Sequence, residues 1–74
     1  METKKEKFER IAQHRVNETI KKIRLIGNLS NRRNYDYEKK HVTQIIEAIE
    51  NEVNDLKAQF KQSLDTENNT FKFK

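Results

Sequence analysis

The fold of this chain is decided by residues 42–60, which read VTQIIEAIENEVNDLKAQF. Six apolar residues in this stretch are spaced at intervals of 4, 3, 4, 3 and 4: Val42, Ile46, Ile49, Val53, Leu56 and Phe60. This alternation is the a/d pattern of a helix that packs against another helix, and Ile45 widens the apolar stripe. The pattern predicts a helix over residues 38–63.

A second apolar stripe lies nearer the N-terminus. Its members recur three or four residues apart: Phe8, Ile11, Ala12, Val16, Ile20, Ile23 and Ile26. At 100° per residue they share one face of a helix. Gly27, the only glycine, follows the last apolar position, where a left-handed residue often ends a helix. We therefore expect a helix over residues 4–26 that ends at a left-handed Gly27.

The chain has 74 residues and no cysteine, so one small domain forms without disulfides or thiolate metal sites. A single core of this size is marginal. The predicted fold is all-α: an antiparallel helical hairpin over residues 1–63 that dimerises into a four-helix bundle. We expect residues 64–74 to form an extended, flexible tail, in which the role of Phe71 and Phe73 is open. The alternative is a monomeric hairpin whose apolar face awaits another protein.

The charge is uneven along the chain. Residues 1–40 hold twelve Lys/Arg against six Asp/Glu, whereas residues 41–74 hold four against six. This asymmetry can steer a polyanion, or a second copy of the chain, to one end of the molecule. No apolar run is long enough to span a bilayer, and the N-terminus lacks the pattern of a signal peptide. We expect a cytoplasmic protein that makes no membrane contact.

The segment between the helices, residues 27–37, is rich in turn-forming residues and longer than most bundle connections. Its candidate contact residues are Arg32, Arg33, Asn34, Tyr35 and Tyr37. Arginine binds phosphates or guanine edges, asparagine pairs with adenine, and tyrosine stacks on an unpaired base. The same residue types are common in protein–protein hot spots. In a third interpretation, the tyrosines and Leu29 fold back to cap the end of the hairpin.

A polar stripe lies opposite the apolar stripe of the first predicted helix. Its members are spaced three and four residues apart: Lys7, Arg10, His14, Asn17, Lys21 and Arg24. Cations in a line match the phosphates of a nucleic acid, and Lys21 and Arg24, nearest the loop, are the candidate contacts. The alternative is an ordinary solvated face.

The sequence offers no enzyme active site. Ser30 has no histidine near it, and no glycine-rich phosphate loop occurs. His14 and Glu18 are one helical turn apart, but a zinc site needs three or four ligands. We expect no catalytic residue, no cofactor and no metal site.

Two short stretches resemble sequences of other proteins: IRLIGNLSN at residues 23–31 and NYDY at residues 34–37. Across residues 15–37 the chain resembles short bacterial proteins of mobile elements, plasmids and phages, for which no activity is established. The resemblance favours regulators of nucleic acid and small inhibitors of host machinery, and it assigns no functional residue.

These observations favour a non-enzymatic regulatory protein that binds nucleic acid through its basic helix face and its loop. One alternative is a protein-interaction module, a small inhibitor or adaptor that docks on a larger complex. Another is a purely structural oligomerisation unit. The sequence leaves open whether the target is DNA, RNA or protein.

Overall fold

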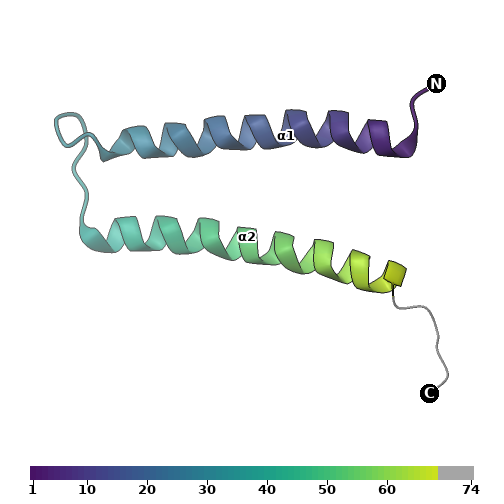
Figure 1. The fold of residues 1–74 in the computed structure, drawn as a ribbon. Helices are drawn as coiled ribbons and strands as arrows, with labels where there is room; N and C mark the ends of the chain where they lie inside the picture. Colours follow the sequence, from purple (N-terminus) through teal and green to yellow (C-terminus); the bar gives the residue numbers. More distant parts are fainter. Residues whose placement is uncertain (69–74) are drawn as a thin grey trace, which may run out of the picture. The chain divides into compact units, whose positions relative to one another are not determined.

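The computed structural model describes residues 1–68, which form two long helices (Figure 1). Helix α1 spans Lys4–Gly27, the 3₁₀ helix η1 spans Asn28–Ser30, and helix α2 spans Lys39–Asn68. Within these residues there is no strand, so the all-α prediction is confirmed. In the same part of the chain no helix is both long and apolar enough to cross a bilayer.

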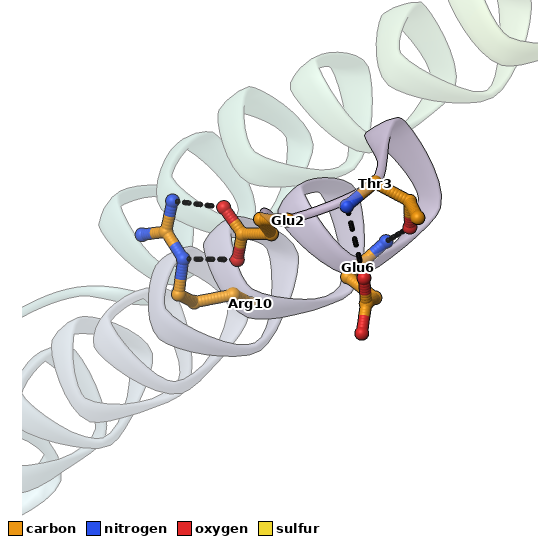
Figure 2. A network of polar contacts seen from close by, with 4 residues as sticks. All are labelled: Glu2, Thr3, Glu6 and Arg10. Atoms are coloured by element: carbon orange, nitrogen blue, oxygen red, sulfur yellow. Dashed lines mark hydrogen bonds and ion pairs between the residues drawn. The ribbon is translucent and has the colours of Figure 1, made fainter.

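Helix α1 begins with a reciprocal cap at Thr3 (Figure 2). The backbone N–H of Glu6 donates to Thr3 Oγ1 at 3.0 Å, and the backbone N–H of Thr3 donates to Glu6 Oε1 at 2.9 Å. This capping box satisfies two donors that a helix start leaves without an intrahelical partner. It explains why α1 begins at Lys4, as the apolar spacing predicted.

Helix α1 ends differently from the prediction. Gly27 is its last residue and is right-handed, with φ −59° and ψ −30°, so the left-handed Gly27 expected from the sequence is wrong. The chain stays right-handed through Asn28, whose backbone N–H donates to the Arg24 carbonyl. The turn Asn28–Ser30 then continues in 3₁₀ form. A helix that tightens into a 3₁₀ turn satisfies its last carbonyls without a left-handed residue.

Helix α2 begins with a cap in which a histidine takes the place of the usual Glu or Gln. The Glu38 carbonyl accepts from the backbone N–H groups of His41 and Val42 at 3.0 and 3.3 Å. The backbone N–H of Glu38 donates in return to Nδ1 of His41 at 2.8 Å. The cap places the first helical residue at Lys39, one residue later than predicted.

Helix α2 continues to Asn68, five residues beyond the predicted end. Leu64 follows Phe60 at an interval of four, so it extends the apolar stripe of the helix by another turn. The segment contains neither glycine nor proline, the residues that most often end a helix. The predicted tail is therefore wrong for residues 64–68. Phe71 and Phe73 lie outside the described residues.

The chain divides into two units, Met1–Asp36 and Tyr37–Lys74. Within residues 1–65 no side chain is fully buried in either unit. Phe8 of α1 is 57% exposed and Phe60 of α2 is 51% exposed, although both belong to apolar stripes. Each helix therefore exposes an apolar face of the kind that packs against a partner. The antiparallel hairpin and the dimer stay predictions.

Candidate nucleic-acid interface

The backbone between the helices folds around Asn31. The Asn31 carbonyl accepts from the backbone N–H groups of Asn34 at 3.2 Å and Tyr35 at 3.1 Å. The Asn31 side-chain oxygen Oδ1 accepts from the backbone N–H of Arg33 at 3.0 Å. We call residues 31–35 the Asn31 turn. Asparagine favours such turns because its side chain bonds backbone two residues on.

The Asn31 turn presents four of the predicted contact residues together. Arg32, Arg33, Asn34 and Tyr35 are all exposed, and Tyr35 exposes 48% of its surface. Because the backbone donors of residues 33–35 bond to Asn31, their side chains are not needed to hold the turn. The turn is thus a compact, cationic element with an aromatic ring at its end.

Tyr37 differs from the other predicted loop residues. It is half-buried, and it begins the second unit of the chain. Arg32 and Tyr37 each make a further interaction with other atoms of the chain. The structure therefore groups Arg32, Arg33, Asn34 and Tyr35 on one turn, and describes Tyr37 with α2.

Lys21 and Arg24 lie three residues apart on α1, and Arg24 is in its last turn. A cation near the C-terminal end of a helix interacts favourably with the helix dipole. Nζ of Lys21 lies 3.5 Å from Oε1 of Glu18, so this cation has a carboxylate beside it. By contrast, the last turn of α1, to which Arg24 belongs, contains no acidic residue.

Further towards the N-terminus, Arg10 of the same polar stripe is also paired with an acid (Figure 2). Its Nε donates to Oε2 of Glu2 at 2.8 Å, and its second guanidinium donor bonds Oε1 of Glu2 at 3.1 Å. This hydrogen bonding raises the pKa of Arg10 above its ordinary value. Two cations of the stripe, Arg10 and Lys21, therefore have carboxylate partners. Its capacity for phosphates is therefore smaller than its sequence suggests.

The capping box has an electrostatic consequence at the start of α1. The backbone N–H of Thr3, together with its side-chain hydroxyl, lowers the pKa of Glu6 below that of an ordinary glutamate. Hydrogen bonds to the carboxylate favour its charged form. The pattern Thr3-Lys4-Lys5-Glu6 is a capping-box signature from which this helix start could have been predicted.

The described residues contain no group of three or more His, Asp or Glu side chains placed to hold a metal ion. Comparison of the chain with protein families, curated proteins and solved structures gave no match. The resemblance to proteins of mobile elements stays a prediction.

Proposed function

We propose that this protein is a non-enzymatic regulator that binds nucleic acid in the cytoplasm, as a homodimer, with the Asn31 turn as its principal contact. The observation that supports the proposal is the turn itself. Three hydrogen bonds onto Asn31 hold its backbone, while the side chains of residues 32–35 are exposed. A preformed cationic turn loses little conformational freedom when it binds.

The residues of the turn suit a polyanion with accessible bases. Arg32 and Arg33 contact phosphates, Asn34 pairs with a base edge, and Tyr35 stacks on an unpaired base. Arg24 and, one turn earlier, Lys21 add positive charge along α1. Tyr37 is a secondary contact. Unit Met1–Asp36 holds ten Lys/Arg against five Asp/Glu, a balance of +5. This charge favours a nucleic acid over an acidic patch of limited size.

The test is a binding titration at two salt concentrations. An RNA or duplex DNA of about 30 nucleotides is titrated with the protein at about 50 and 200 mM salt. We expect affinity that falls steeply with salt, because each neutralised phosphate releases counterions. Affinity weaker than about 100 μM at low salt, or no salt dependence, contradicts the proposal.

A matched pair of variants locates the contact. Arg33→Gln and Lys61→Gln each remove one positive charge from an exposed position, the first in the Asn31 turn and the second on α2. We expect Arg33→Gln to reduce the salt slope by about one per site and Lys61→Gln to leave it unchanged. Equal effects of the two variants would indicate attraction by net charge alone.

The second candidate function is a protein-interaction module, and the exposed apolar stripes of both helices favour it. Large exposed apolar patches often mark protein-binding surfaces. A pull-down that recovers one specific protein after nuclease treatment would support this alternative. In a purely structural oligomerisation unit, by contrast, Arg32 and Arg33 would be dispensable for function.

A further inference from the structure

We propose that α2 pairs with α2 of a second copy in parallel and in register. The contact is made by the apolar residues at positions a and d, which we call the α2 seam: Val42, Ile46, Ile49, Val53, Leu56 and Phe60. The proposal goes beyond dimer formation, because it specifies which helix forms the contact and in which orientation.

The α2 seam lies on one continuous helix and is open to a partner. Leu56 is 49% exposed and Phe60 is 51% exposed, and all six seam residues lie within the unbroken helix Lys39–Asn68. Alternating intervals of four and three keep a seam facing a partner helix along its length. The seam is therefore suited to a partner with the same repeat, and a second α2 has it by identity.

The charges beside the seam favour the parallel orientation. In this register Ile46, Val53 and Phe60 occupy a positions, so Glu52 is at position g and Lys57 is at position e. In a parallel pair each g residue lies near the e residue five positions later in the other helix. Glu52 then faces Lys57 of the second copy, and the twofold axis repeats this attraction on the other side of the seam.

The antiparallel orientation meets repulsion at the same positions. Aligning all six seam residues in opposite directions pairs Ile46 with Leu56 and Ile49 with Val53. That alignment sets Glu50 against Glu50 of the second copy, and likewise Glu52 against Glu52. Like charges directly opposite destabilise a helix pair. Sliding the helices by one heptad relieves the repulsion but deprives Val42 and Ile46 of apolar partners.

The orientation decides where the two Asn31 turns lie in the dimer. Five residue steps separate Asn34 from Lys39, a chain length of at most about 18 Å. In a parallel pair both Lys39 ends meet, so both turns lie at the same end. In the antiparallel pair, residue 39 lies near residue 63 of the other copy, and the two ends are about 36 Å apart. If the proposed nucleic-acid binding holds, the parallel dimer contacts its ligand with two turns at once.

Disulfide cross-linking of the full chain tests the orientation without nucleic acid. Because the chain has no cysteine, single substitutions give clean probes. Ile46→Cys and Leu56→Cys place a thiol in the α2 seam, and Asn51→Cys places one on the opposite face as a matched control. Chains carrying Ile46→Cys and Leu56→Cys are mixed and equilibrated in a glutathione buffer. Because the two variants have equal mass, the Leu56→Cys chain is labelled with ¹⁵N, and the disulfide-linked dimers are then identified by their mass.

A parallel pair joins position 46 to 46 and position 56 to 56, because positions 46 and 56 of the two copies are about 15 Å apart along the axis. We expect these like-to-like links to exceed those of Asn51→Cys by about tenfold or more. Links mainly between positions 46 and 56 would establish the antiparallel pair and overturn the proposal. Yields no higher than the Asn51→Cys control would also overturn it.

A second measurement leaves the seam intact. Spin labels at Gln44→Cys and Ala58→Cys lie on the face opposite the seam. A parallel pair gives shorter distances for 44 to 44 and 58 to 58 than for 44 to 58, since the latter adds about 21 Å along the axis. The reverse order overturns the proposal. Neither experiment involves nucleic acid, so failure here is distinguishable from failure of the proposed function.

Discussion

The two helices carry similar apolar stripes but different polar faces. Unit Met1–Asp36 has an excess of five positive charges, whereas residues 41–56 of α2 contain four acids and no Lys or Arg. Both stripes are exposed on the helices that carry them. From this difference we infer that each apolar stripe packs against a partner, while the polar residues determine which partner that is. In our account α1 and its turn face a polyanion, and α2 faces its own copy.

The helix starts make a second comparison. Thr3 and Glu6 cap helix α1, and Glu38 and His41 cap helix α2. In both, the side chain three residues into the cap accepts from the backbone N–H of the first residue. The first pair follows a familiar sequence pattern. In the second, a ring nitrogen of histidine accepts the same bond as the Glu6 carboxylate does in the first.

The largest effect is expected at the α2 seam. Leu56→Asp should weaken dimerisation by at least about a hundredfold, because it removes apolar burial and adds an unpaired carboxylate to the contact. Leu25→Asp is the control, since Leu25 of α1 is 58% exposed and lies off the apolar stripe. It should leave the dimer intact by analytical ultracentrifugation. Equal losses for the two variants would show that the seam is not the contact.

A smaller effect is expected for the charges beside the seam. Lys57→Glu turns two attractions in the parallel pair into repulsions, and should raise the dimer dissociation constant by roughly tenfold at low salt. The double change Glu52→Lys/Lys57→Glu restores opposite charges and should recover most of the loss. Fluorescence titration at low and high salt measures both. A double variant that dimerises more weakly than Lys57→Glu alone would count against the parallel register.

Gly27 gives a smaller and opposite effect. A Cβ added there meets nothing within 4 Å, and the residue is right-handed. Gly27→Ala should therefore stabilise α1 by about 0.5–1 kcal/mol, measured by thermal or urea unfolding followed by circular dichroism. A left-handed Gly27 would give destabilisation instead, and that result would refute the helix end described above.

The smallest effect concerns pH. The pKa of Glu6 is lowered in the folded state, so its charged form contributes stability above the pKa of the unfolded chain. That contribution is lost as the pH falls through the lower, folded pKa. Helicity at the start of α1, followed by NMR, should decrease over this acidic range. Glu6→Gln should abolish this loss of helicity at acidic pH. Glu9→Gln removes a carboxyl outside the capping box and should leave the loss of helicity unchanged.

The two helices were predictable because they depend on apolar spacing. The stripe from Phe8 to Ile26 placed α1 to within one residue at its end. The end of α2 was missed because the polar residues after Ser63 resemble a tail, although Leu64 continues the stripe. Gly27 was misassigned because glycine allows a left-handed end but does not require one.

The candidate site was predictable in its composition but less so in its geometry. The abundance of Asn between the helices indicated a turn, yet only the structure shows that Asn31 accepts all three bonds. The pairing of Arg10 with Glu2 spans eight residues and crosses the helix start. Periodicity within a helix does not reveal it, because Glu2 precedes the helix and its position depends on the Thr3 cap.

In the proposed dimer, the apolar stripe of α2 is covered by a second copy, and the Asn31 turn stays open to its ligand. Sedimentation equilibrium of the full chain tests this dimer most directly. We expect a molar mass of about 18 kDa, twice the 9.0 kDa of one chain, in micromolar solution without nucleic acid. A mass that stays at 9.0 kDa over the whole concentration range, in samples that are helical by circular dichroism, would contradict it.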